Sequence, residues 1–391
     1  MKILHFSAIY APAWKWGGPP RSVANLAEGL AANGYEVTVL TTDAGLETDS
    51  ALVRGRAVER NGVQVTYFPS RWNRLGLNSS ELVAAVAKRA AEFDVIHLSG
   101  VWQPTFPAAG KAARRARVPY VVSPRGMLGP YSFTQGRLKK FLYWRLVERA
   151  HLRRAAALHA TSAMEYEELS GLLPGVPIFN IPNAIDTAAW RRDENAAAAW
   201  RVRHGIVPEI PVFLASGRLH HKKGLEFLAE ALAQIPAAQD WRMVFAGPDE
   251  DGTKAKLEAG FAAMGLRDRV VFCGQCDTQE LTTLYSAADA LLFPSRHENF
   301  GNVAVEALAC GCPVVLSEGV GAAGALAKLP SVKVVKRDAQ EWGTAVKALI
   351  AERTMWAGRR AELANAAEAT FSPRSVAIAV AAEYARLAGK T

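Results

Sequence analysis

The chain has 391 residues, of which half are apolar, 46 are Lys or Arg, and 37 are Asp or Glu. This length corresponds to two or three domains, and the apolar fraction excludes disorder as a description of the whole chain. The mean hydropathy is +0.02, and no apolar run reaches the roughly 18 residues of a membrane span. Four cysteines and an opening without a signal-peptide pattern argue for a reducing cytoplasm and against a disulfide scaffold.

The net charge of +9 is concentrated in the first half of the chain. Residues 1–185 hold 22 Lys and Arg against 13 Asp and Glu, whereas residues 186–391 hold 24 of each. Between Lys111 and Arg154, 12 basic residues accompany one acid, Glu148. Such a patch attracts phosphates, anionic lipid headgroups or nucleic acid.

In the first half, short β-rich apolar runs alternate with Ala-rich segments of helical length. Strands are predicted at residues 2–7, 36–42, 63–68, 94–99, 120–123 and 157–161. Helices are predicted at residues 22–32, 81–92, 107–117, 136–155 and 162–171, each with apolar residues on one face. This alternation predicts a parallel sheet covered by helices on both sides.

The alternation stops near residue 185 and then restarts. Further strands are predicted at residues 212–216, 242–246, 270–273, 290–293, 314–317 and 332–335, and a last helix at 372–388. Two doubly wound units joined near residue 185 explain this pattern. Because ligands of open α/β sheets bind at the carboxyl ends of strands, functional residues are expected directly after strands.

Two carboxylates, Glu298 and Glu306, lie eight positions apart after the strand predicted at 290–293. If a helix begins near Gly301, Glu306 lies inside it and Glu298 lies on the preceding loop. The N–H groups of residues 301–303 would then present the positive end of the helix dipole to a ligand, and the glycine would let a diphosphate approach. The alternative is that Glu298 interacts only with the helix dipole and Glu306 is solvated.

Two loops with paired glycines follow other predicted strands. After the strand at 212–216, Arg218 and Lys223 lie between two glycines, which suits a phosphate or pyrophosphate, or an ordinary basic loop. After the first strand, Gly17 and Gly18 would let a helix N-terminus approach a ligand, although glycine turns are common at this place.

The segment 294–315 contains Glu-Asn-Phe-Gly-Asn-Val-Ala-Val-Glu and ends in Gly-Cys-Pro-Val-Val. It resembles the E-x7-E signature of glycosyltransferase family 4, which comprises retaining, nucleotide-sugar-dependent enzymes. Further motifs resemble the family in chain order, at the early Gly-Gly loop and at residues 94–97, 120–124, 160–165, 181–183, 218–224 and 245–247. The resemblance therefore covers essentially the whole chain.

The resemblance implies an α/β fold of GT-B architecture, with two Rossmann-like doubly wound domains facing each other across a cleft. Residues 1–185 would form the acceptor-binding domain and residues 186–371 the nucleotide-sugar donor-binding domain. The helix at 372–391 would pack back toward the N-terminal domain.

The resemblance also implies roles for single residues. Arg218 and Lys223 would hold the donor diphosphate. Glu298 would contact the transferred sugar, and Glu306 would bind the ribose hydroxyls. The other expected donor-binding residues are Gly17, Gly18, Gly247, Asn299, Phe300, Gly301, Asn302 and Val303. In the usual account of this family the leaving phosphate takes the acceptor's proton, so no nucleophilic side chain is assigned, and neither cofactor nor metal is expected.

One position departs from the family pattern. Where many relatives carry a His after the strand at 120–123, this chain has Arg125, which stays charged near neutral pH and would bind a phosphate of the donor or the acceptor. His97, at the end of the strand at 94–99, would line the cleft. The alternative is a buried core histidine.

Three patterns imitate other sites. The four cysteines, spaced C-x-x-C and C-x-C, have zinc-ligand spacing, but small core side chains explain them. The sequence Asp249-Glu-Asp251 imitates a metal-binding D-x-D, but a solvated turn is expected there. No G-x-G-x-x-G follows the first strand, which argues against a dinucleotide-dependent dehydrogenase.

In the basic segment, Leu138, Leu142 and Leu146 recur at helical spacing. One interpretation packs this stripe on the amino-terminal sheet and leaves the cations solvated. The other places the cations against anionic lipid headgroups or an acceptor's pyrophosphate, where each contributes about 1 kcal/mol. The cations concerned are Arg137, Lys139, Lys140 and Arg145.

The sequence thus predicts a retaining, metal-independent hexosyltransferase that uses a UDP- or GDP-sugar. The acceptor would be a carbohydrate or a polyprenyl-diphosphate-linked glycan, in surface polysaccharide or lipopolysaccharide biosynthesis. A cytoplasmic location is expected. Peripheral binding to an anionic membrane surface, at the inner face of the plasma membrane, is an option. Nucleic acid is not an expected partner. Two alternatives remain: a catalytically inactive GT-B protein that binds anionic surfaces or nucleic acid, and a sugar-nucleotide epimerase.

Overall fold

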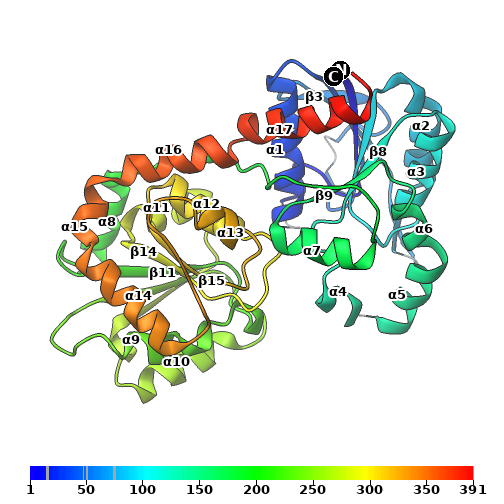
Figure 1. The fold of residues 1–391 in the computed structure, drawn as a ribbon. Coiled ribbons are helices and arrows are strands. Elements are labelled where there is room, and N and C mark those ends of the chain that lie inside the picture. Colours follow the sequence, from blue (N-terminus) through cyan, green and yellow to red (C-terminus); the bar gives the residue numbers. More distant parts are fainter. Residues whose placement is uncertain (15–16, 47, 50–51, 74–75, 135, 391) are drawn as a thin grey trace. The chain divides into compact units, whose positions relative to one another are not determined.

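The computed structural model describes residues 1–14, 17–46, 48–49, 52–73, 76–134 and 136–390 (Figure 1). The chain forms two compact units. Unit 1 comprises Met1–Ile185 and Phe371–Thr391, and unit 2 comprises Asp186–Thr370. The domain boundary predicted from the sequence also lies at residue 185. The predicted C-terminal segment begins at residue 372, one residue after the point where the chain returns to unit 1.

Unit 1 is built on an eight-stranded sheet of order β10-β9-β8-β7-β1-β2-β4-β3, in which only β3 and β4 pair antiparallel. Its strands are β1 Lys2–Ser7, β2 Glu36–Thr42, β3 Ala57–Arg60, β4 Val63–Phe68, β7 Val95–Ser99, β8 Tyr120–Ser123, β9 Ala157–Ala160 and β10 Ile178–Asn180. The strands β3 and β10 were not predicted from the sequence. Both are short edge strands, so they lack the continuous apolar run of a strand buried on both faces.

Helices cover both faces of this sheet. They are α1 Gly18–Ala32, α2 Ser80–Arg89, α3 Thr105–Arg115, α4 Pro130–Thr134, α5 Arg137–Tyr143, α6 Arg149–Leu152, α7 Ala163–Leu172 and α17 Pro373–Leu387. Two short strands, β5 Arg71–Asn73 and β6 Gly76–Asn78, form a separate antiparallel pair. Because alternate side chains of a strand point to opposite faces, Leu4 and Phe6 enter one core and Ile3 the other. No helix in the described part of the chain is long and apolar enough to cross a bilayer.

The C-terminal helix α17 packs on α1 within unit 1 (Figure 1). Gly29 allows this approach, because a Cβ atom there would lie 2.2 Å from the carbonyl oxygen of Pro373. Val376 and Tyr384 of α17 are buried in the same core as Ile3. The last helix is therefore an integral part of unit 1.

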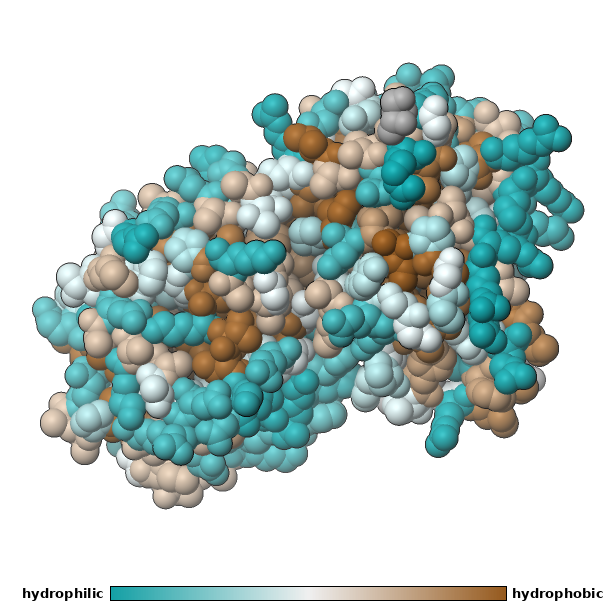
Figure 2. Space-filling view, viewed as in Figure 1, coloured by the Kyte–Doolittle hydropathy of each residue, from teal (hydrophilic) through white to brown (hydrophobic). Residues whose placement is uncertain are grey.

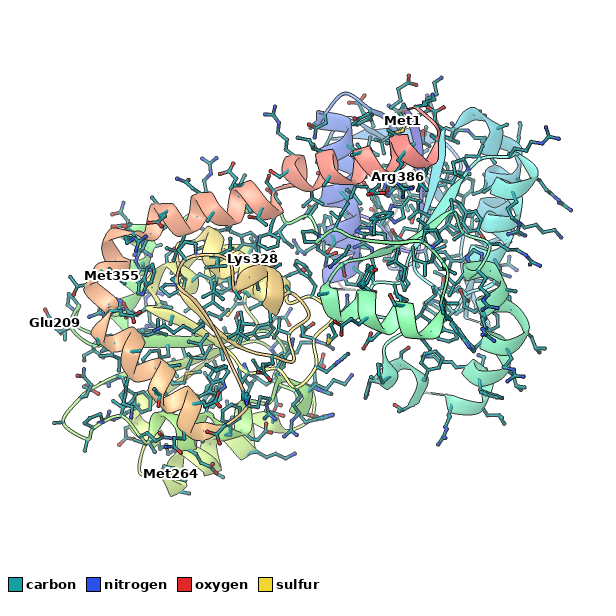
Figure 3. All side chains as sticks on the ribbon, in the orientation of Figure 1. Met1, Glu209, Met264, Lys328, Met355 and Arg386 are labelled. Carbon is teal, nitrogen blue, oxygen red and sulfur yellow. The ribbon has the colours of Figure 1, made fainter. Side chains whose placement is uncertain are left out.

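Both ends of the chain meet at Asp94, beside the start of β7. Its carboxylate accepts a hydrogen bond from the backbone N–H of Lys2 at 2.7 Å and pairs with Lys390 at 2.7 Å. Met1 and Arg386 mark this end of unit 1 in Figure 3.

The segment predicted as one helix at 136–155 is interrupted. A π-helical turn, Trp144–Glu148, lies between α5 and α6. The inward face carries Lys140, Trp144 and Glu148 at intervals of four residues. These side chains surround Trp102, whose ring lies 5.2 Å from Lys140 Nζ and whose backbone N–H donates to Glu148 at 3.2 Å.

As a result, the leucine stripe of this segment faces away from the core. The exposed fractions are 73% for Leu138, 49% for Leu142 and 76% for Leu146, and the neighbouring Phe141 is 53% exposed. The interpretation that this stripe packs on the sheet is wrong, because polar and aromatic side chains occupy the inward face instead.

Unit 2 is a six-stranded parallel sheet of order β13-β12-β11-β14-β15-β16. Its strands are β11 Val212–Ser216, β12 Arg242–Ala246, β13 Val270–Gly274, β14 Ala290–Phe293, β15 Val314–Ser317 and β16 Val332–Val335, which confirms the six predicted strands to within one residue. Its α-helices are α8 Glu194–Arg203, α9 Leu228–Leu232, α10 Thr253–Ala263, α11 Thr278–Ala287, α12 Asn302–Ala309, α13 Ala323–Leu326, α14 Ala339–Ala351, α15 Arg353–Gly358 and α16 Arg360–Phe371. Since β11 and β14 are neighbours, their carboxyl ends lie side by side.

Candidate functional site

The loop between β14 and α12 has a fixed backbone. The helix α12 begins at Asn302, preceded by Gly301 at φ +99°. A Cβ atom at Gly301 would lie 2.7 Å from Cγ1 of Val320, so only glycine fits. The N–H of Glu298 donates to the carbonyl of Gly319 at 2.9 Å. The predicted helix start is thus confirmed, and Glu298 lies on the loop before it.

The side chains of Lys223 and Glu298 meet beyond the carboxyl ends of the neighbouring strands β11 and β14. Lys223 Nζ lies 2.5 Å from Glu298 Oε2, and the side chains are only 18% and 29% exposed. The ammonium also lies 5.3 Å from the ring centre of Phe293. Two residues that the sequence analysis selected from separate motifs therefore form one partly buried ion pair, which solvent screens less than a surface pair.

Arg218 begins the same loop as Lys223 but is more exposed. Its side chain is 66% exposed, and Nη1 lies 2.9 Å from Glu250, which follows β12. The two loops touch, since a Cβ atom at Gly247 (φ +148°) would lie 1.9 Å from the carbonyl oxygen of Gly217. Gly247 is required for this close approach.

Asp251 lies in the exposed turn that the sequence predicts, and its side chain also connects the same two loops. Oδ1 accepts from the hydroxyl of Thr253 at 2.5 Å, and Oδ2 accepts from the backbone N–H of His221 at 3.0 Å. These hydrogen bonds hold the pKa of Asp251 well below its usual value. With His220 and His221 it forms the one group of three metal-capable side chains found among the described residues. Because Asp251 Oδ2 also lies 2.9 Å from Nδ1 of His221, this group links the loop after β11 with the loop after β12.

Glu306 is held from behind by a buried tyrosine. The hydroxyl of Tyr285, on α11, lies 3.3 Å from Glu306 Oε2 and 2.8 Å from Oγ of Ser216 at the end of β11. Burial, followed by the charge of Glu306, raises the pKa of Tyr285 well above 10, so the phenol keeps its proton. Sequence reasoning missed Tyr285, because it lies in an ordinary amphipathic helix and belongs to no motif.

The remaining donor-site candidates of unit 2 surround the start of α12. Phe300 is buried, and its carbonyl accepts from the N–H of Ala322 at 3.0 Å, so it anchors the loop. Asn302 and Val303 form the first turn of the helix and are partly exposed, and Asn299 precedes them on the loop.

This arrangement suits an anionic ligand with hydroxyl groups. The cations of Arg218 and Lys223 and the first turn of α12 all favour a bound phosphate. The carboxylate of Glu306 lies more than one turn inside α12, where it would accept hydrogen bonds from hydroxyl groups.

Unit 1 holds a cavity of about 160 Å³ at the carboxyl ends of β1, β7 and β8. Arg125 lines it, at φ +53°, and its Nη1 donates to Asn183 at 2.9 Å. Burial lowers the pKa of Arg125 to about 10, which keeps it charged at neutral pH. Gly17 immediately precedes α1, which begins at Gly18, just before the prolines that line the cavity, but neither glycine is among the lining residues.

His97 does not line this cavity, in contrast to the expectation of a cleft position. Its side chain is completely buried between those of His5 and His159, with ring centres 4.8 and 5.5 Å away, and Nδ1 is hydrogen-bonded to the hydroxyl of Tyr384. Burial lowers its pKa well below 6.5. Because β7 lies in the middle of the sheet, its central side chains point into a core rather than toward the strand ends.

The four cysteines are free thiols. Cys310 and Cys312 are fully buried, and burial raises the pKa of both. No group that combines these cysteines into a metal site occurs among the described residues.

Comparison with known proteins adds to this geometry. Residues 197–370 match the family described as glycosyl transferases group 1, and residues 17–184 match the glycosyl transferase 4-like domain. The chain is 30% identical to a D-inositol 3-phosphate glycosyltransferase of Xylanimonas cellulosilytica, over 90% of this chain and 87% of that protein. It is 26% identical to the GDP-mannose:cellobiosyl-diphosphopolyprenol alpha-mannosyltransferase of Xanthomonas campestris, over 81% and 79%.

Among solved structures, Anabaena HepE in complex with UDP superposes with a TM-score of 0.74 at 22% identity, over 99% of this chain and 100% of that chain. At this identity the likeness shows the fold alone, and that fold is GT-B. The fold expected from the sequence is thereby confirmed.

Proposed function

The chain belongs to the group 1 glycosyltransferases, and on that premise we propose that it transfers a hexose from a UDP- or GDP-sugar bound by unit 2, with retention of the anomeric configuration. The observation that carries the proposal is the meeting of Lys223 and Glu298 at the carboxyl edge of this sheet, beside the first turn of α12. A diphosphate needs such cations and N–H donors, and the sugar beyond it needs a hydrogen-bond acceptor. HepE, of the same fold, binds UDP, which supports the choice of donor.

In this proposal each polar side chain of the site has one task. Arg218 and Lys223 neutralise the diphosphate as it leaves, while Glu298 accepts hydrogen bonds from hydroxyls of the transferred sugar. Glu306, oriented by the hydroxyl of Tyr285, binds the ribose. Gly247 and Gly301 leave room for the donor to approach the backbone. Around the donor lie Asn299, Phe300, Asn302 and Val303.

The chemical step is the breaking of the bond between the sugar's anomeric carbon and the phosphate oxygen. Positive charge develops on the sugar and negative charge on the phosphate, so cations fixed at the phosphate stabilise the transition state. The departing phosphate oxygen takes the proton of the acceptor hydroxyl as the new bond forms on the same face. We assign no nucleophilic side chain and no metal ion to this step.

We further propose that unit 1 binds the acceptor in the Arg125 cavity. The Xanthomonas relative acts on a diphosphopolyprenol-linked glycan, which supports a carbohydrate or polyprenyl-diphosphate-linked acceptor here, in surface polysaccharide or lipopolysaccharide assembly. The exposed cations and leucines of α5 support a cytoplasmic enzyme that acts at the inner face of the plasma membrane.

A donor screen tests the proposal. Thermal shift and donor hydrolysis are measured with UDP-, GDP- and ADP-sugars, and NMR of the product determines its anomeric configuration. Selective stabilisation by one nucleotide and a product with the donor's configuration are expected. Inversion would refute the proposed mechanism, and the absence of any nucleotide effect would refute the donor site.

A further inference from the structure

A second, larger cavity of unit 1 lies beside α5. Its volume is about 720 Å³, and its walls include Trp102, Met127, Lys140, Leu142, Tyr143 and Leu146. This is large enough for a stretch of hydrocarbon, since ligand pockets typically span about 300–1,000 Å³. Most of these walls are apolar or aromatic.

The mouth of this cavity is an exposed apolar surface. Leu142 and Leu146 line the cavity and are 49% and 76% exposed, and Leu138 and Phe141 extend the apolar surface along α5. Figure 2 shows hydrophobic atoms together with hydrophilic ones in this part of unit 1. Contiguous exposed apolar side chains of this kind mark interaction sites.

The rim of the mouth is cationic. Arg137, Lys139 and Arg145 are exposed next to the leucines, and Lys139 lines the cavity. Glu148, the one acid between residues 111 and 154, is buried, so it does not belong to this surface. Lys140 differs from the other cations, because it points inward over Trp102 and its Nζ donates to the Ser132 carbonyl at 2.6 Å. The occupant must therefore combine an apolar chain with an anionic group.

This cavity and the smaller one at the strand ends share part of their walls. Val101, Gln103 and Met127 line both this cavity and the smaller one that contains Arg125. Among the described residues, Gln103 Oε1 and Tyr143 Oη are buried without a hydrogen-bond partner. Buried polar atoms of this kind are usually satisfied, so their vacant hydrogen-bonding capacity points to a polar part of a ligand.

We infer that this cavity is the carrier site of a lipid-linked acceptor. The apolar chain enters between Leu142 and Leu146, the phosphate group lies against Lys139 and Lys140, and the glycan extends along Gln103 toward Arg125. This inference rests on the proposed function, since it names the acceptor's chemical class and the place where its carrier binds.

Binding of farnesyl diphosphate, a short prenyl diphosphate, tests the inference by calorimetry. The full chain carries Arg218→Ala and Lys223→Ala, so that the proposed donor site cannot hold the diphosphate. Adding Leu142→Glu and Leu146→Glu should weaken binding about tenfold or more, because the hydrocarbon that would cover these exposed leucines contributes at least about a factor of ten. Val202→Glu is the matched control, since Val202 is 79% exposed on unit 2, and it should leave the affinity unchanged.

Other outcomes would overturn the inference. Inorganic diphosphate that binds as tightly as farnesyl diphosphate would indicate a free phosphate site. Binding only to anionic vesicles, with none to farnesyl diphosphate, would indicate surface docking without a carrier site. Equal effects of the leucine pair and of Val202→Glu would also refute it. The nucleotide screen of the wild-type protein is independent of these results, so failure of the donor site and failure of the carrier site are distinguishable.

Discussion

The hydroxyl of Tyr285 lies between Oγ of Ser216 at 2.8 Å and Oε2 of Glu306 at 3.3 Å, so that α11 connects the end of β11 with α12. Since the phenol keeps its proton, it donates to the carboxylate and orients it. Glu306 is therefore a positioned hydrogen-bond acceptor rather than a solvated helix residue.

Replacing Glu306 with Ala should remove most transferase activity while the fold is retained. One lost charge-assisted contact costs about 1.5–3 kcal/mol, which corresponds to roughly a ten- to hundredfold loss of rate. The measurement is kcat/KM for the nucleotide sugar, with circular dichroism to verify folding. Glu368→Ala, at an exposed position of α16, is the control. Near-full activity of Glu306→Ala would contradict the assigned role.

Activity should persist in excess EDTA, because Arg218, Lys223 and the start of α12 provide the positive charge that a metal would otherwise supply. The measurement is the transfer rate with EDTA and after addition of Mn²⁺ or Mg²⁺. Loss in EDTA with recovery by either ion would mean that His220, His221 and Asp251 act as metal ligands rather than as a bridge between loops.

Unit 1 should lose stability as the pH falls below 6.5. Burial lowers the pKa of His5 and of His159 to about 3, so the folded state resists their protonation while the unfolded chain accepts protons near pH 6.5. Their contribution to the free energy of unfolding is full above pH 6.5 and is lost as the pH falls toward 3. The unfolding midpoint of His5→Leu should depend less steeply on pH in this range. An unchanged slope, equal to that of the exposed-site control His297→Leu, would contradict this account.

Glu148 should have the opposite effect. Burial raises its pKa to about 8, so its contribution to stability is full below pH 4.5 and is lost as the pH rises through 8. Glu148→Gln keeps the shape and the hydrogen bond from Trp102 without a titratable group. Its unfolding midpoint should exceed that of the wild type at pH 9 and approach it at pH 5. A variant that is less stable than the wild type at pH 9, relative to Glu368→Gln, would contradict the claim that burial disfavours the ionised carboxylate.

Much of the donor site could be predicted from the sequence because its signals are local. A buried strand followed by a glycine loop and a helix start is visible in the residues around Gly301, and the loop from Arg218 to Lys223 shows the same pattern. What joins these loops was not visible. The contact of Gly247 with Gly217 and the hydrogen bond from Tyr285 depend on the order of strands in the sheet.

The errors have physical reasons of the same kind. His97 was expected near a ligand because it was placed at the end of the strand predicted at 94–99, yet it lies in the middle of β7, and the middle of a parallel sheet is buried on both faces. Helical spacing in the α5 segment identified an apolar face correctly, but one of the two interpretations placed that face in the core. The inward face of the segment instead packs around Trp102, which contacts Trp144, Lys140 and Glu148. The periodicity of the segment alone does not reveal this partner.

The central claim is that Lys223 and its neighbours at the carboxyl edge of the unit 2 sheet hold a nucleoside diphosphate. Isothermal titration of UDP and of GDP into the wild type, Lys223→Ala and the surface control Lys347→Ala tests it most directly. The account predicts that one nucleotide binds the wild type and the control alike, and that Lys223→Ala weakens this binding about tenfold or more through the lost charge-assisted contact. Equal affinity in all three proteins, or binding of neither nucleotide to any of them, would contradict it.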